Sequence, residues 1–180
     1  ASVRPGFHFE VSPGVIHGGE RENDEMLKAW PWKEKPWIGA PVWHMHESFE
    51  RLARLRAAYP RICIGSSGDY QTPGAQRWWY RMAGAMNVLC DNDGRPAVKI
   101  HGLRRLNVDI FSRIPLSSAD STNIARNIGI DSKWKGTYLP QTKRGRARVI
   151  RERIEAFQSP ERWDKSHAFE TQCLPILCVN

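Results

Sequence analysis

Pro115-Leu-Ser-Ser-Ala-Asp120-Ser-Thr-Asn-Ile-Ala-Arg126-Asn127 is the stretch that decides how we interpret the fold. It begins with a short, largely apolar run and then sets a carboxylate directly before hydroxyls, an amide and a guanidinium. A buried strand of an α/β protein opens onto its carboxyl-end loop in this way, and ligands bind at that end. We therefore expect Asp120 to stand at a site. The alternative that this stretch leaves open is that Asp120 and the hydroxyls after it cap the next helix.

Strand-like and helix-like segments alternate five times along the chain. The strand patterns fall at 7–13, 37–44, 61–67, 97–101 and 116–119, and the helix patterns between them at 20–30, 48–59, 73–90 and 107–114. The connections are too long for hairpins, so the pattern is typical of parallel βαβ units in an α/β protein.

Two of these helices have a clear apolar face. In 48–59, Ser48 is the expected N-cap, and the predicted buried positions are Phe49, Leu52, Leu55 and Ala58. The arginines of that helix, Arg51 among them, are expected mostly on the opposite face. The helix at 73–90 gathers four large apolar residues on one side, namely Trp78, Met82, Met86 and Leu89.

Length and composition are those of one globular domain with a substantial core. The chain has 180 residues, of which 41% are hydrophobic and 26% charged, and no stretch approaches the roughly 20 apolar residues of a membrane span. The first residues lack the apolar centre of a secretory signal. We expect a soluble, cytosolic protein. The net charge of +8 favours an anionic partner, most often nucleic acid.

The four cysteines form no metal-binding pattern. Cys63, Cys90, Cys173 and Cys178 are scattered and contain no CxxC pair. In an intracellular chain they are expected to be reduced core residues, and we expect neither a metal ion nor a cofactor.

A basic segment follows Asp120. The run 143–153 has six basic residues in eleven and continues into a predicted helix ending at 157, whereas 159–180 is expected to form an irregular tail after a domain of residues 1–158. Two interpretations stay open for the charges: a solvated helix face, or contact with phosphates. The residues expected at such a contact are Lys133, Lys135, Lys143, Arg144, Arg146 and Arg148.

Three strand ends together resemble a known family. In chain order they are Gly65-Ser-Ser-Gly68-Asp69, His101-Gly102-Leu103 and Ser118-Ala-Asp120-Ser121. They are similar to the last three strands of the tRNA-guanine transglycosylase superfamily barrel, and most similar to phage relatives that are thought to place 7-deazaguanines in DNA. The resemblance extends over roughly residues 7–157. It implies a TIM-type (β/α) barrel, here partial, with about five βα units that correspond to the later strands.

The resemblance also implies a mechanism. In this superfamily an aspartate at the end of the last strand attacks C1′ of a guanosine, expels guanine and holds the sugar covalently until another base attacks; Asp120 stands at that position. A carboxylate suits an oxocarbenium-like transition state, as in retaining glycosidases. It must be ionised, and the candidate hydrogen-bond donors are Ser118, Ser121 and Asn123.

By similarity, further residues are expected at the base. The backbone amides of Gly65 and Ser66 would bind the purine carbonyl oxygen, and His101, followed by Gly102, would lie against the flat face of the base. Asp69 would accept from the base or hold its own loop.

Three more residues are expected near the substrate. One of His44 and His46 would point into the site, since both follow the Val42-Trp strand and the strand period decides which. Arg126 would lie near the nucleic-acid backbone or be a surface charge.

The chain departs from the family in three respects. Gly14 stands where the relatives have an acid that reads guanine. The zinc-binding cysteine cluster of the tRNA enzymes is absent, which favours DNA as the substrate. Five βα units are fewer than eight, so a strand edge must be covered, by a second copy or by another chain.

The function that the resemblance implies is a DNA-guanine transglycosylase that exchanges guanine for a 7-deazaguanine base, acting in the host cytoplasm if phage-encoded. Its partners would be DNA, alternatively tRNA, and the incoming base, with no membrane. The alternatives are a base-excising N-glycosylase, a tRNA-guanine transglycosylase, and an inactive relative that only binds nucleic acid.

Overall fold

Strands and helices alternate along the chain as expected. The computed structural model describes residues 9–32, 34–120 and 140–165. Its elements are β1 (Glu10–Val11), α1 (Glu20–Ala29), β2 (Gly39–Ala40), β3 (Val42–His44), α2 (Phe49–Ala58), β4 (Arg61–Gly65), a 3₁₀ turn η1 (Gly68–Tyr70), α3 (Gln76–Leu89), β5 (Lys99–Gly102), α4 (Val108–Phe111), β6 (Ser118–Ala119) and α6 (Lys143–Glu155). The prediction of an α/β protein is confirmed, although most elements are shorter than predicted.

All the described strands pair in parallel and in chain order. One sheet contains β1 and β2, and the other has the order β3-β4-β5-β6. The predicted strand 37–44 is divided at Pro41 between the two sheets. Ala40 before it accepts a backbone hydrogen bond from Ser12 (3.0 Å), and Pro41 itself accepts one from Cys63 (2.8 Å). The described residues form no closed barrel.

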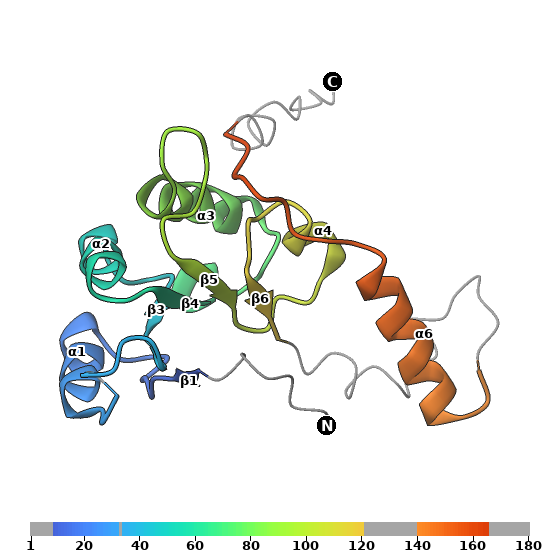
Figure 1. The fold of residues 1–180 in the computed structure, drawn as a ribbon, viewed down its shortest axis with the longest axis horizontal. Coiled ribbons are helices and arrows are strands. Elements are labelled where there is room, and N and C mark those ends of the chain that lie inside the picture. Colours follow the sequence, from blue (N-terminus) through green and yellow to red (C-terminus); the bar gives the residue numbers. More distant parts are fainter. Residues whose placement is uncertain (1–8, 33, 121–139, 166–180) are drawn as a thin grey trace, which may run out of the picture.

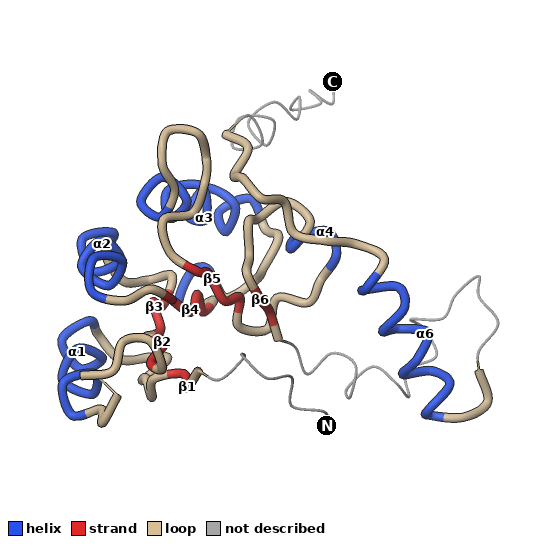
Figure 2. The backbone as a smooth tube through the Cα atoms, in the orientation of Figure 1, coloured by secondary structure: helices blue, strands red, loops and turns tan. Residues whose placement is uncertain are grey.

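The strands lie inside an arc of helices. Helices α1 to α4 follow one another around one side of the sheets (Figures 1 and 2). On the other side, the ring centroids of Phe9 and His101 are 5.2 Å apart. Phe9 directly precedes β1, and His101 lies in β5. With the divided strand β2–β3 and β4 between them, β1 and β5 are three strand spacings apart, about 14 Å in a flat arrangement. Because side chains stand roughly perpendicular to a sheet, the contact indicates that the strands curve around a concave face.

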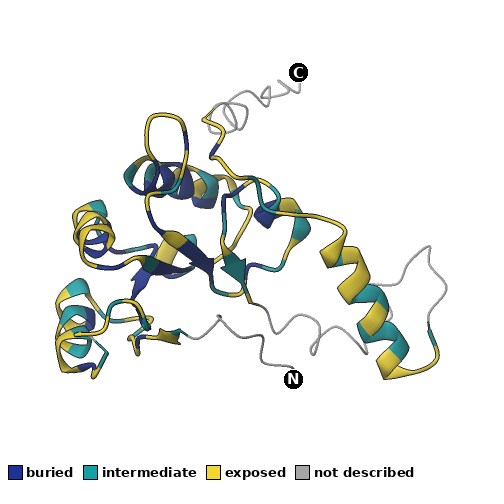
Figure 3. Ribbon diagram, in the orientation of Figure 1, coloured by how far each residue is buried: buried dark blue, intermediate teal, exposed yellow. Residues whose placement is uncertain are grey.

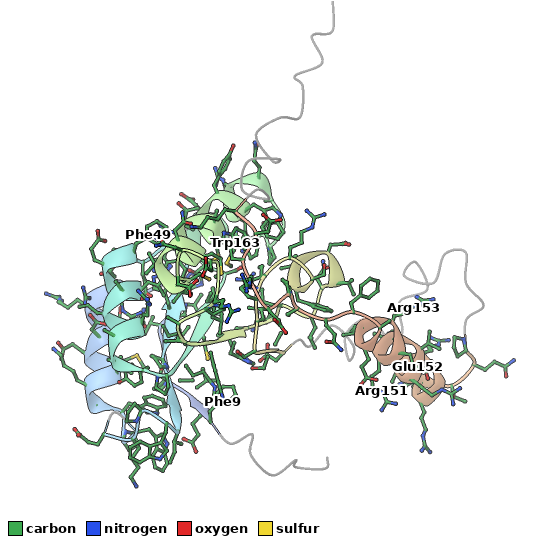
Figure 4. All side chains as sticks on the ribbon, turned by 45° about the horizontal axis from the view of Figure 1, so that its top comes forward. Phe9, Phe49, Arg151, Glu152, Arg153 and Trp163 are labelled. Atoms are coloured by element: carbon green, nitrogen blue, oxygen red, sulfur yellow. The ribbon has the colours of Figure 1, made fainter. Side chains whose placement is uncertain are left out.

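The main core fills the space between the strands and the helices. The face predicted for α3 is confirmed, since its four large apolar side chains are all buried there. They pack with alternate strand residues such as Trp43, Ile64 and Ile100. Figure 3 shows buried residues on α3 and on the strands that it covers. Trp163, from the predicted tail, joins the same core (Figure 4). Its backbone N–H donates to the Gly94 carbonyl at 2.8 Å.

Two helix starts illustrate where local pattern succeeds and fails. Ser48 caps α2 as predicted, its hydroxyl accepting from the Arg51 N–H at 3.1 Å. Helix α3 begins at Gln76 rather than at Pro73. The reason is Gly74, whose φ of +87° is a left-handed turn conformation that a helix does not contain.

The predicted faces of α2 need two corrections. Ala58 is exposed in the last turn, whereas Arg51 is only 2% exposed. Arg51 is buried because its guanidinium has partners on three sides. It donates to the Val42 carbonyl (2.9 Å) and to the carboxylates of Glu47 and Asp24 (2.7 Å each).

Helix α6 extends away from the arc (Figure 1). It is a basic helix as predicted, but it ends at Glu155 rather than at 157. None of its side chains is fully buried. Within the described residues, no helix combines the length and the apolar character that crossing a membrane requires.

Arg51→Met should destabilise the protein by about 3 to 5 kcal/mol, because it leaves the Glu47 carboxylate buried without its cation. Arg54→Met is the matched control: Arg54 shares Asp24 at 3.2 Å but is 60% exposed, so its loss should cost about 1 kcal/mol at most. Urea denaturation of both variants measures the difference. Equal losses would contradict a dominant role for the buried pair.

Candidate functional site

A cavity of about 630 Å³ opens at the carboxyl ends of the strands. Its size is that of a small-molecule site. Its lining comes mainly from residues of β1, β3 and β4 and from the segments after β1, β4, β5 and β6. It consists of Val11, Ser12, Gly14, Ile16, Val42, His44, Gly65, Ser66, Gln71, Pro73, Leu103, Arg104, Asn107, Ile110 and Asp120. Four predicted site residues therefore meet here: His44, Gly65, Ser66 and Asp120.

Asp120 follows β6 and is held by its backbone. Its N–H donates to the Gly102 carbonyl (3.2 Å), and its own carbonyl accepts from Arg105 (2.8 Å). The side chain remains 56% exposed at the cavity. The part of the chain that a helix-capping role would concern, 121 onward, lies outside the described residues.

The hydrogen-bond donor to the carboxylate is Arg104, which the sequence did not indicate. Its backbone N–H donates to Asp120 Oδ1 at 2.5 Å. Arg104 has a φ of +57°, a left-handed conformation that is costly for a residue with a side chain and is characteristic of functional sites. Of the predicted donors, Ser118 bonds to His101 instead, and Ser121 and Asn123 lie outside the described residues.

His101 lies beneath Asp120 on the concave face. Its Nδ1 is 2.8 Å from the Ser118 hydroxyl, and its Nε2 is 3.8 Å from Asp120 Oδ2, longer than a hydrogen bond. Burial lowers the pKa of His101, although the Asp120 carboxylate acts in the opposite direction. If the Ser118 hydroxyl donates to Nδ1, the proton on Nε2 faces the carboxylate.

His44 fills the space beside Gly14. Its Nε2 is buried and has no hydrogen-bond partner within 9–32, 34–120 and 140–165. A Cβ on Gly14 would lie 2.9 Å from that nitrogen and 3.3 Å from Asn23 Oδ1, closer than packing tolerates. Burial, followed by the charges of His46 and Arg51, lowers the pKa of His44 to about 4. A neutral imidazole therefore lies against Gly14.

His46 has a different role. Its ring nitrogens lie 2.7 Å from the Ser67 hydroxyl and 2.9 Å from the Gly18 carbonyl, and it is not among the residues that line the cavity. It therefore links the loop after β1 to the loop after β4. Of the two histidines, the one at the cavity is His44.

The remaining candidates for contact with the base differ in their position relative to the cavity. Gly65 lines the cavity, and a Cβ there would lie 3.3 Å from His44 Nδ1, so the glycine keeps the two strands close. The Cβ missing from Gly102 would point toward Arg105 and Leu116 instead, away from the cavity. Asp69 is 86% exposed, faces Arg77 at 3.8 Å and is not part of the lining, which favours a role in its own loop.

Two buried polar residues that the sequence did not single out fix the loops around the cavity. Asn23 of α1 accepts a hydrogen bond from the Val15 N–H (2.7 Å) and donates to Glu47 (2.8 Å). Glu47 in turn accepts from the His44 N–H at 2.7 Å. In a single sequence both look like solvated polar residues, since no local signal marks a partner 24 residues away.

The predicted phosphate-contact residues are only partly described. Lys143, Arg144 and Arg148 are exposed on α6, with Arg148 3.7 Å from Glu152. Arg146 is half-buried and donates to the Pro140 carbonyl at 2.9 Å. The other three, Arg126, Lys133 and Lys135, lie outside the described residues.

Cys63 and Cys90 are free and buried, as expected of reduced core residues. Burial raises the pKa of Cys63 to about 12 and that of Cys90 to about 11, so neither is a reactive thiolate near neutrality. Cys173 and Cys178 lie outside the described residues. Within 9–32, 34–120 and 140–165, no group of three histidine, cysteine or acidic side chains is placed to hold a metal ion.

Comparison with protein-family models, with curated proteins and with solved structures gives no match for this chain. The family resemblance of the strand-end motifs therefore stays a prediction. What the cavity itself provides is one exposed carboxylate, a neutral imidazole and a glycine-containing strand end within a single small-molecule-sized space.

The neutral state of His44 predicts a pH dependence of stability. Because its folded pKa lies below the unfolded value, protonation favours unfolding, and stability is lost as the pH falls from about 7 toward 4. Between pH 7 and pH 5 His44 should contribute a loss of roughly 1 to 2 kcal/mol. Denaturation of the native protein and of His44→Gln at both pH values measures this contribution. An equal loss in the two proteins would show that His44 is not its source.

Proposed function

We propose that this chain is a DNA-guanine transglycosylase that exchanges guanine for a 7-deazaguanine base through a covalent aspartyl-glycosyl intermediate. The observation that carries the proposal is the position of Asp120. Its carboxylate is exposed at the mouth of a small-molecule-sized cavity, accepts the Arg104 N–H and lies 3.8 Å from His101. A hydrogen bond from a backbone N–H in a fixed position orients the carboxylate for attack.

In the proposed reaction an oxygen of Asp120 bonds to C1′ of the nucleotide. The bond from C1′ to N9 breaks, and its electron pair leaves with guanine. The guanine anion takes up a proton from water, and the incoming base loses its N–H proton to water. The nitrogen so exposed attacks C1′, and the bond from C1′ to the Asp120 oxygen breaks with its electron pair returning to the carboxylate. The base would lie over the Gly65-Ser66 strand end, in the cavity that Asp120 borders, and His101, 3.8 Å from Asp120, would stabilise its carboxylate.

A partial (β/α) barrel is the architecture we propose for this reaction. Parallel strands in chain order, helices on one side and contact between Phe9 and His101 across the concave face are all consistent with a barrel segment. Its open edges, at β1 and β6, would be covered by a second copy or another chain.

DNA is the proposed substrate, held by the exposed cations of α6. The target nucleotide must leave the duplex, since C1′ and the edge of the base are otherwise shielded. A second candidate function is base excision, in which water attacks the intermediate. The observation that favours it is the 56% exposure of the Asp120 side chain, which gives water access to the reacting carbon.

Asp120→Asn should abolish a covalent adduct with guanine-containing duplex DNA, because the amide is a poor nucleophile. The control is Asp93→Asn, at an exposed carboxylate in the loop before β5. A denaturing gel detects the adduct, and mass analysis of the nucleosides separates exchange from an abasic product. Parallel reactions with tRNA identify the nucleic acid. An adduct that persists in Asp120→Asn would contradict the assignment of the nucleophile.

Lys143→Ala combined with Arg144→Ala should weaken DNA binding about tenfold or more, because two phosphate contacts are lost. For the same reason, the slope of the logarithm of the binding constant against the logarithm of the salt concentration should become shallower by about 2. Both residues are exposed at the start of α6. Arg95→Ala combined with Arg113→Ala removes the same charge from the loop before β5 and from the end of α4. Fluorescence anisotropy at several salt concentrations measures both quantities. Equal effects of the two pairs would indicate a response to net charge alone.

A further inference from the structure

Arg105 is a buried cation that pairs with no acidic side chain of the described residues. Its side chain is 1% exposed, and its guanidinium lies over the ring of Trp78, 4.5 Å from the centroid. Nη2 is 3.5 Å from the sulfur of Met45, and Nη1 has no hydrogen-bond partner among the residues that the structure describes. Within the described residues no carboxylate pairs with it. Burial lowers the pKa of Arg105 to about 10, so the group is still charged near neutrality.

The guanidinium lies behind the cavity, on the helix side of the strands. The Met45 sulfur that contacts it is 3.9 Å from the Ser66 hydroxyl, and Trp78 donates its indole N–H to the same hydroxyl at 2.9 Å. Ser66 lines the cavity on its other side. The backbone N–H of Arg105 donates to the Asp120 carbonyl. The backbone of Arg105 is thus bound to the end of β6, which bears Asp120. Its charged side chain lies behind the end of β4, which is followed by Ser66.

A purely structural role does not account for this residue. An uncompensated buried charge opposes folding, and an apolar side chain of similar volume fills such a space at lower cost. Arg51 shows the contrast, since its guanidinium is equally buried but has two carboxylates and a carbonyl as partners. A buried polar group left without a partner requires another explanation.

We propose that Arg105 stabilises, by its field across Ser66, the negative charge that develops on the departing base. This inference rests on the proposed function and adds a group to it. When Asp120 bonds to C1′, the electron pair of the broken bond to N9 moves onto the base; Arg105 transfers no proton and touches no reacting atom. A fixed charge in a region without water or counterion acts strongly at short range and needs no rearrangement during the reaction.

The test compares Arg105→Met and Arg105→Lys with the native protein, and Arg113→Met is the matched control. Arg113 also lies near an indole ring, 6.0 Å from the centroid of Trp79, but it is exposed. The measurements are the melting temperature and the single-turnover rate of adduct formation on DNA that carries guanine, hypoxanthine or xanthine, in order of increasing acidity of the departing base.

The melting temperature of Arg105→Met should be unchanged or higher, by roughly 2 to 4 °C, because a buried charge has been removed. Its rate with guanine should fall about 10- to 100-fold, and the loss should shrink as the departing base becomes more acidic. Arg105→Lys should keep most of the rate, and Arg113→Met should behave as the native protein does.

One outcome would overturn the inference in favour of a packing role: Arg105→Met loses stability together with rate, and the loss of rate is the same for every departing base. A native rate in Arg105→Met would overturn it as well, while leaving the proposed function in place. Failure of the native protein to form any adduct would overturn both.

Discussion

The buried ion pair between Arg51 and Glu47 is the interaction on which the arrangement of the site depends. Glu47 accepts from the backbone of His44 at the end of β3 and from the side chain of Asn23 in α1. Asn23 in turn holds Val15, beside the glycine that borders the cavity. One pair of opposite charges therefore connects α1, α2, β3 and the loop after β1. A buried pair is a weak source of stability but allows few alternative geometries.

The parts of the fold that follow from local patterns could be predicted from the sequence. Alternating strand and helix segments gave the parallel α/β class, and the spacing of Trp78, Met82 and Met86 gave the buried face of α3. Ser48 and the basic helix were predicted for the same reason, since a cap and a charge run are visible within a few residues. The starts of three strands were not, since those predicted from 37, 97 and 116 begin two residues later, at Gly39, Lys99 and Ser118, because a short parallel strand begins where its neighbour allows pairing.

The features that depend on partners distant in the chain could not be predicted from the sequence. Arg51 was expected on the solvent face because three of its neighbours in α2 are charged, yet its partners come from β3 and α1. The left-handed conformation of Arg104 has no local signature, since a glycine or asparagine is the usual sign of one. The position of Asp120 directly after a strand, by contrast, could be predicted, because an abrupt change from apolar to polar residues marks a strand end even without knowledge of the neighbouring strands.

The contact between Gly14 and His44 has a consequence for how such a chain can change. Because a Cβ at position 14 would lie 2.9 Å from the imidazole, the two positions are not independent. A carboxylate is accommodated at 14 only after the side chain at 44 has become smaller or has moved, and a large residue at 44 in turn requires glycine at 14. A substitution at 14 therefore depends on which side chain occupies 44.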